Sequence, residues 1–197
     1  PGLPFNLIFG QGCRKKHDKS WIVIRGEGTI DKYIGDAVMA FWGAPLYHPH
    51  HADLAVTAGL RMLSALDDLN VDFAKKGWPE VRIGVGVNTG LMSVGNMGSR
   101  FRRAYTVLGD AVNLGSRLEG ITKIYGVSFI VSETTAHSAG RFHYRELDRV
   151  RVKGKAEPVS IYKVLNAKDR PAVMHRPTAS AGNLISRNFE LEELATV

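Results

Sequence analysis

The sequence predicts an α+β sandwich in which helices cover one face of a sheet. Three observations indicate this class. Residues 52–76 place leucines at helical spacing, residues 82–88 alternate apolar and polar like a strand, and the segment around Gly35 has the composition of a β-hairpin. The chain has 197 residues, 44% of them hydrophobic and 23% charged, which is enough to bury one core. We therefore expect one domain with irregular ends.

The other expected elements follow in chain order. Residues 1–20 are rich in turn residues and show no sustained periodicity, so no regular element is expected there. Trp21 then opens an apolar stretch that leads through a turn into the hairpin. A second long helix begins at Asp110, whose carboxylate favours the positive end of the helix dipole, and ends at Gly126. Strands are expected at 127–131, 144–152 and 158–165, and a short helix at 133–139.

Composition argues against several classes of protein. The net charge of +7 invites a nucleic-acid interpretation, but the basic residues are scattered, so we expect no nucleic-acid binding. The most apolar run, residues 37–42, is far too short to cross a bilayer, and the N-terminus has no signal pattern. The single cysteine, Cys13, cannot form an internal disulfide. We expect a cytoplasmic location, and membrane attachment of a longer parent protein stays open.

Two motifs carry the candidate chemistry. Residues 28–41 read Gly-Thr-Ile-Asp-Lys-Tyr-Ile-Gly-Asp-Ala-Val-Met-Ala-Phe and place Lys32 and Asp36 on the two sides of a glycine turn. Residues 105–117 read Tyr-Thr-Val-Leu-Gly-Asp-Ala-Val-Asn-Leu-Gly-Ser-Arg and place Asn113 and Arg117 one helical turn apart. Taken singly, each of these residues is more often a turn residue or a solvated surface group.

Together the two motifs resemble those of the class III nucleotidyl cyclases, which close a nucleoside triphosphate into a 3′,5′-cyclic monophosphate. The resemblance covers residues 28–165 and implies a ferredoxin-like cyclase sandwich with a lacking or divergent first strand. We divide the chain into a divergent or truncated N-terminal segment (1–20), a cyclase catalytic domain (21–165), and a linker or tail (166–197) that could lead into a further domain.

The resemblance also implies roles for individual residues. Cyclisation needs cations that neutralise phosphate oxygens and stabilise the transition state. By resemblance, Asp36 binds Mg²⁺ or Mn²⁺, with two ions per site, as hard cations prefer carboxylates. Asn113 orients the ribose and Arg117 bonds the α-phosphate. Lys153 meets the terminal phosphates, and Lys155 is a weaker candidate for that task.

Lys32 and Thr106 match the family positions that select the base. Adenine offers an acceptor at N1 and a donor at N6, so a Lys donor and a hydroxyl acceptor complement it, whereas guanine calls for a carboxylate. The pair favours an adenylyl cyclase that makes cyclic AMP and pyrophosphate from ATP in signal transduction. A guanylyl cyclase is the weaker alternative.

The family implies a homodimer, in which one subunit supplies the metal-binding Asp residues and the other supplies Lys32, Thr106, Asn113 and Arg117. One departure is serious. Cyclases carry a first metal Asp on an opening strand of the form Phe-x-Asp-Ile/Val-x-x-Phe, and we expect no such strand before Trp21. The alternative is therefore a non-catalytic, cyclase-like dimerisation or regulatory module.

A cluster of histidines follows the hairpin. His48, His50 and His51 lie within four residues of one another in the sequence, but they have no obvious ligand partner. A solvated loop is the favoured interpretation over a metal site.

Overall fold

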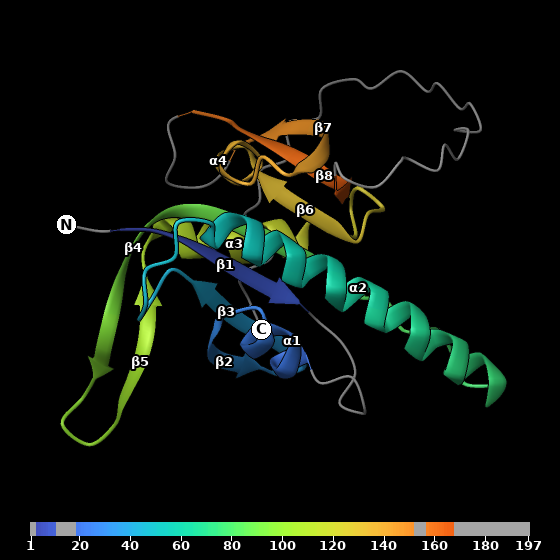
Figure 1. Cartoon of the computed structure of the whole chain (residues 1–197), viewed down its shortest axis with the longest axis horizontal. Helices are drawn as coiled ribbons and strands as arrows, with labels where there is room; N and C mark the ends of the chain where they lie inside the picture. Colours follow the sequence, from blue (N-terminus) through green and yellow to red (C-terminus); the bar gives the residue numbers. More distant parts are fainter. Residues whose placement is uncertain (1–2, 11–18, 152–156, 168–197) are drawn as a thin grey trace.

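The computed structural model describes residues 3–10, 19–151 and 157–167, which build a mixed sheet with helices around it (Figure 1). The strand order is β2-β3-β1-β4-β6-β8-β7, and β5 pairs with β4 beside this path. This arrangement confirms the predicted α+β class. The elements, in chain order, are β1 (Leu3–Gly10), α1 (Lys19–Arg25), β2 (Thr29–Ile34), β3 (Ala37–Trp42), α2 (His51–Lys75), β4 (Val85–Gly98), β5 (Arg103–Leu108), α3 (Asp110–Gly120), β6 (Phe129–Ser132), α4 (Glu133–Ser138), β7 (Phe142–Val150) and β8 (Val159–Ala167).

Helices cover both faces of the sheet, so the expectation of a single covered face was wrong. Val85 and Val87 of β4 join the core that includes Val56 of α2. Gly86 lies between them and points to the opposite face, where an added Cβ would meet the backbone nitrogen of Glu119 in α3 at 2.3 Å. The glycine therefore lets α3 approach the second face closely.

The long helix α2 confirms the helix predicted at 52–76. Small residues line its N-terminal half, and Gly59 lets the ring of Phe129 come within 2.5 Å of where a Cβ would stand. Its C-terminal half extends beyond the sheet (Figure 1). Gly77 follows the helix with φ +68°, a conformation that favours glycine and ends the helix. None of the helices in the described ranges has the length and apolar character that a membrane span requires.

Two elements overturn the expectation that residues 1–20 form no regular structure. β1 lies in the middle of the sheet, antiparallel to both β3 and β4, with Leu7 opposite Phe41 and Asn88. α1 begins at Lys19, and the apolar stretch from Trp21 belongs to it. Distant strands determine the pairing of β1, and such pairing leaves no local pattern to detect.

The remaining elements confirm their predictions with shifted bounds. β4 begins at Val85 instead of residue 82 and continues to Gly98, because its second half pairs with β5 in a long hairpin. α3 ends at Gly120, and turns occupy the residues up to Gly126. The predicted tail after residue 167 lies outside the described residues.

Candidate functional site

The hairpin of β2 and β3 presents Lys32 and Asp36. Gly35 turns the chain with φ +61°, and Asp36 follows it in an exposed position. The ammonium of Lys19, the first residue of α1, donates a hydrogen bond to the backbone carbonyl of Asp36 at 3.2 Å. This contact attaches the hairpin turn to α1. It uses the backbone of Asp36, so the side-chain carboxylate takes no part in it.

Lys32 follows an irregularity in β2 that sequence reasoning missed. Ile30 pairs with Ala40, but Lys32 pairs with Met39, so Asp31 is an extra residue in the ladder. The Lys32 ammonium lies 3.4 Å from an oxygen of the Asp31 carboxylate. The Lys32 side chain is 49% exposed, whereas that of Asp31 is 1% exposed.

Thr106 lies on β5, directly before the turn into α3. The residue is 8% exposed, and its hydroxyl oxygen is buried without a hydrogen-bond partner within the described ranges. A buried hydroxyl normally has a partner, so one that lacks it is available to a ligand atom. Gly109, with φ +147°, then starts α3.

Asn113 and Arg117 lie on α3 as the sequence predicts. Leu114 and Leu118 of this helix are buried with Ile130 and Ile161 of the sheet. Asn113 is exposed and Arg117 is half-buried, so the pair lies on a different face of the helix from the leucines.

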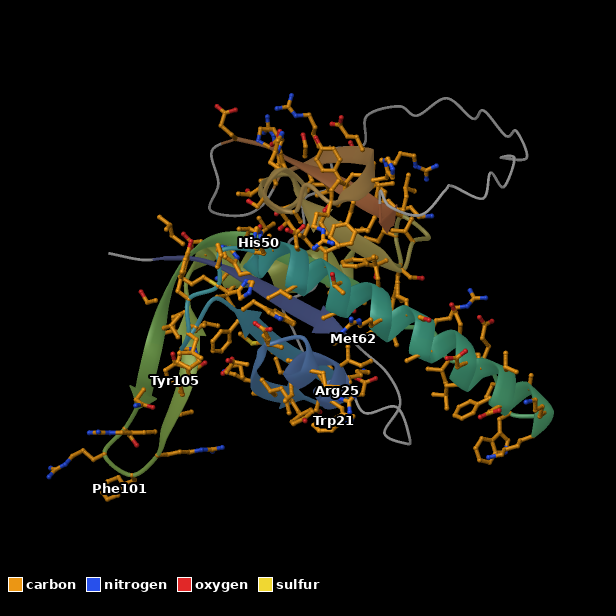
Figure 2. The ribbon with its side chains drawn as sticks, in the orientation of Figure 1. Trp21, Arg25, His50, Met62, Phe101 and Tyr105 are labelled. Atoms are coloured by element: carbon orange, nitrogen blue, oxygen red, sulfur yellow. The ribbon has the colours of Figure 1, made fainter. Side chains whose placement is uncertain are left out.

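A small apolar cluster brings these elements together. Met39 and Phe41 of β3 pack with Val107 of β5, and Val112 at the start of α3 packs against the same cluster. The rings of Phe41 and Tyr105 lie 6.1 Å apart, and β2 contacts β5 directly. The cluster therefore connects the strand of Lys32, the strand of Thr106 and the helix that carries the Asn–Arg pair. Figure 2 shows Tyr105 nearer the sheet and Phe101 at the far tip of the β4–β5 hairpin.

The described residues do not complete a site for two metal ions. The end of β1 is the right place for a first carboxylate, because Gly10 pairs with Val38, two residues after Asp36. The strand reads Leu-Pro-Phe-Asn-Leu-Ile-Phe-Gly and contains no acidic residue. Across the ranges that the structure describes, no three His, Cys, Asp or Glu side chains are placed to hold a metal ion. Asp36 is the predicted metal ligand that the structure describes, and Lys153 lies outside the described residues.

Glu119, near the end of α3, is a buried carboxyl that the motifs did not indicate. It is 9% exposed, and its Oε1 has no hydrogen-bond partner in the described part of the chain. Burial raises its pKa above the ordinary value, and the charge of Asp36 raises it further, whereas Lys123 and Lys19 oppose the shift. The negative charge of Asp36 therefore acts on the Glu119 carboxyl.

The histidine cluster forms ion pairs at the start of α2. His48 lies 3.5 Å from Glu27, and His50 lies 3.8 Å from Asp53. Burial, together with nearby His48, lowers the pKa of His51, and Asp53 opposes this shift. Each of these contacts joins one histidine to one carboxylate.

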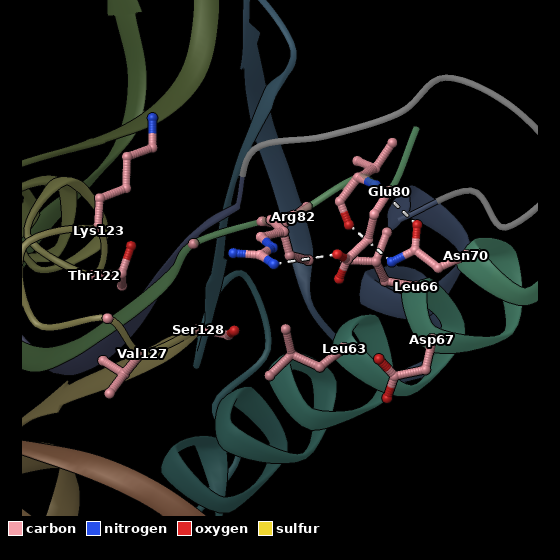
Figure 3. Close-up of a pocket in the computed structure, with 14 residues that line it drawn as sticks. Leu63, Leu66, Asp67, Asn70, Glu80, Arg82, Thr122, Lys123, Val127 and Ser128 are labelled. Carbon is pink, nitrogen blue, oxygen red and sulfur yellow. Dashed lines mark hydrogen bonds and ion pairs between the residues drawn. The ribbon is translucent and has the colours of Figure 1, made fainter. Parts of the chain in front are cut away.

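A cavity of about 580 Å³ lies elsewhere in the molecule, with Gly84, a neighbour of Glu119, among its lining residues (Figure 3). The second half of α2, the lead into β4 and the loop from α3 to β6 line it. Asn70 donates to the carbonyl of Val81 at 2.8 Å and accepts from its amide at 2.9 Å. Arg82 pairs with Glu80 at 3.2 Å beside this contact. Of the predicted site residues that the structure describes, none lines the cavity.

Comparison with known proteins bears on the whole arrangement. Residues 29–166 match the family model described as "Adenylate and Guanylate cyclase catalytic domain". An adenylate cyclase of Anabaena cylindrica is 40% identical over 145 residues, and adenylate cyclase 1 of Rhizobium meliloti is 36% identical over 147. The matches cover 70% and 74% of the chain but only 28% and 22% of those proteins. The chain therefore spans about a quarter of the length of these relatives.

Solved structures give the same picture of the fold. The adenylyl cyclase CyaB from P. aeruginosa superimposes with a TM-score of 0.74 at 27% identity, covering 86% of the chain and 97% of CyaB. The guanylyl cyclase Cya2 gives 0.72 at 27% identity, covering 86% of the chain and 95% of Cya2. The two similarities are nearly equal, so they do not distinguish an adenine nucleotide from a guanine nucleotide.

Proposed function

Because the chain belongs to the adenylate and guanylate cyclase catalytic domain family, we propose that it converts ATP into 3′,5′-cyclic AMP and pyrophosphate. In this proposal residues 21–165, together with β1, act as the catalytic domain, and residues 166–197 are a linker or tail. The product would serve in signal transduction.

The observation that carries the choice of ATP is the hydroxyl of Thr106, which is buried and unpartnered within the described residues. In the proposed complex it accepts a hydrogen bond from N6 of adenine, and Lys32 donates one to N1. Guanine presents a carbonyl oxygen and an N1–H donor at these positions, which would leave the ammonium facing a donor. Sites with fixed polar groups reject such ligands strongly, because a buried group is left unpaired.

The proposed reaction is an attack of the ribose 3′-oxygen on the α-phosphorus, with pyrophosphate as the leaving group. Asn113 orients the ribose, and the guanidinium of Arg117 bonds the α-phosphate oxygens as negative charge gathers on them. Lys153 is proposed to meet the leaving phosphates. The spacing of Asn113 and Arg117 on one face of α3 directs both side chains toward one ligand.

A homodimer is part of the proposal, with the Asp36 of one subunit opposite the Lys32, Thr106, Asn113 and Arg117 of the other. Exposed apolar side chains lie beside these residues, namely Tyr33, Ile34 and Leu108. Apolar surface next to a site that one subunit cannot complete is typical of an interface.

Divalent ions enter the proposal through the family. The family implies Mg²⁺ or Mn²⁺, and Asp36 is the predicted ligand among the described residues. The steps proposed above accordingly use only side chains of the protein. The absence of acidic residues on β1 favours a second candidate function, a cyclase-like module that binds nucleotide and dimerises without turnover.

The test is to incubate the full chain with ATP and Mn²⁺ and to measure cyclic AMP. We expect product from the wild type and about 100-fold less from Arg117→Ala, since removing one stabiliser of developing charge costs at least that much. Arg145→Ala, an exposed arginine on β7, serves as the matched control and should match the wild type.

Other outcomes separate the candidates. ATP binding without product favours the non-catalytic module, and undiminished turnover by Arg117→Ala contradicts the assigned mechanism. Equal turnover of GTP in direct competition would contradict the base selection.

A further inference from the structure

We propose that Asp31 is a positioning residue that sets the base preference of the site by holding the ammonium of Lys32. This inference rests on the proposed function, because it concerns how the same site distinguishes ATP from GTP. It assigns a role to a buried carboxylate that the proposed reaction leaves unused.

The extra residue in β2 determines the direction of Lys32. Side chains alternate between the faces of a regular strand, and Ile30 packs into the core beneath α2. Without the extra residue, Lys32 would point to the same face as Ile30. Instead it pairs with Met39, whose side chain belongs to the cluster on the opposite face. The bulge at Asp31 therefore turns Lys32 toward the face on which Met39 of β3 packs with Val107 of β5.

Burial and charge connect Asp31 to Lys32. The Asp31 side chain is 1% exposed, and neither of its oxygens has a hydrogen-bond partner within the described residues. A buried carboxylate without hydrogen bonds is costly unless an opposite charge compensates it. The ammonium of Lys32, at 3.4 Å, supplies that charge. Withdrawal of Lys32 into solvent would leave the carboxylate buried and uncompensated.

This pairing limits the movement of a flexible side chain. Lys has a four-carbon stem and a rotatable ammonium with three donors. One donor directed at Asp31 leaves the other two for a ligand, and a side chain that is already ordered loses less entropy on binding. A fixed ammonium also cannot move away from the N1–H of guanine. Loss of Asp31 should therefore reduce discrimination, chiefly through weaker binding of ATP.

The experiment measures displacement of a fluorescent ATP analogue by ATP and by GTP, using the full chain with Mn²⁺. We expect Asp31→Asn to lower the preference for ATP over GTP by about 10-fold, the scale of one hydrogen bond from Lys32 to the base that is no longer held in place. Asp31→Glu, which keeps the charge, should retain part of the preference.

A double-mutant cycle and a matched control separate positioning from general stability. If Asp31 acts through Lys32, Asp31→Asn should have no further effect on the preference in a Lys32→Met background. Asp53→Asn changes another carboxylate with a buried, unpartnered oxygen, in a residue that is 8% exposed and lies on α2. It should leave the preference unchanged, and thermal unfolding of each variant reports stability.

The outcomes distinguish the inference from the function on which it rests. A wild type without any preference for ATP contradicts the proposed base selection. The inference is overturned if Lys32→Met abolishes the preference for ATP but Asp31→Asn leaves that preference intact. If Asp31→Asn does not fold, Asp31→Glu decides: full retention of the preference overturns the inference, and partial loss in a folded chain supports it.

Discussion

Among single residues, Glu119 is a buried carboxyl that also feels the negative charge of Asp36. Its pKa in the folded protein is raised from 4.5, first by burial and then by Asp36, whereas Lys123 and Lys19 lower it. Because its pKa is raised, the carboxyl binds its proton more tightly in the folded protein than in the unfolded chain. The free energy of unfolding therefore falls once the pH exceeds the pKa of the unfolded chain. Its place near the C-terminal end of α3 adds to this cost, because the helix dipole is negative there.

Glu119→Gln should therefore stabilise the fold at neutral and higher pH. The gain in the free energy of unfolding should be present at about pH 8 and nearly absent at about pH 3, where the carboxyl is protonated in both states. Urea unfolding at the two pH values measures it. Glu146→Gln, an exposed glutamate on β7, is the control and should show no such difference. A larger gain at the lower pH would contradict the argument.

Sequence patterns predict the candidate residues of the site but say nothing of their surroundings. The two sequence motifs contain Lys32, Asp36, Asn113 and Arg117. Thr106 is assigned from its place shortly before Gly109 in the second motif. The bulge at Asp31 and the burial of Glu119 depend on the partner strand and on close approach of α3 to β4. Neither leaves a signal in the local sequence, because both arise from tertiary contacts.

At the scale of elements, local periodicity succeeded where an element is defined by its own residues. Helix α2 has leucines at helical spacing along its length, and α3 has both a glycine start and a buried stripe. Strand β1 lacks the alternation of apolar and polar residues that marks a strand, and its neighbours in the sheet lie far along the chain. The short helix α1 was missed because Trp21 to Ile24 is as apolar as a strand.

The end of β1 offers a direct test of the missing carboxylate. Phe9 and Gly10 close the strand, and the next residue in the sequence, Gln11, occupies the third position of a Phe-x-Asp pattern, though it lies outside the described residues. Gln11→Asp should strengthen Mn²⁺ binding at least about tenfold, because hard cations gain from each added carboxylate.

Calorimetric titration of Mn²⁺ into the nucleotide-free chain measures this effect. Asn6→Asp, which places the same charge farther back on β1, is the control. Equal affinity in the wild type and Gln11→Asp would show that the end of β1 is not the site of the absent ligand.

At the scale of the whole molecule, the proposed dimer makes a complementation experiment possible. Asp36→Asn and Arg117→Ala damage opposite halves of each proposed shared site. A mixed dimer then contains one site with both defects and one site with neither. Mixing the two inactive variants should restore up to about a quarter of wild-type activity, as random pairing of equal amounts makes half the dimers mixed and each has one intact site.

Cyclic AMP production by the mixture, compared with each variant alone, is the measurement. A mixture of Arg117→Ala with Asn113→Ala, whose defects fall on the same half, should stay inactive. Recovery in that mixture, or none in the first, would contradict an interface site.

The central place of β1 has a consequence for how the protein is made. It is the only described strand that joins the β2–β3 hairpin to β4 and the strands beyond it. Among the described strands β1 leaves the ribosome before the others, yet one of its two neighbours appears only after residues 85–92 have been synthesised. Until then the nascent chain carries an unclosed sheet edge, and a chaperone that shields such edges would protect it from aggregation during translation.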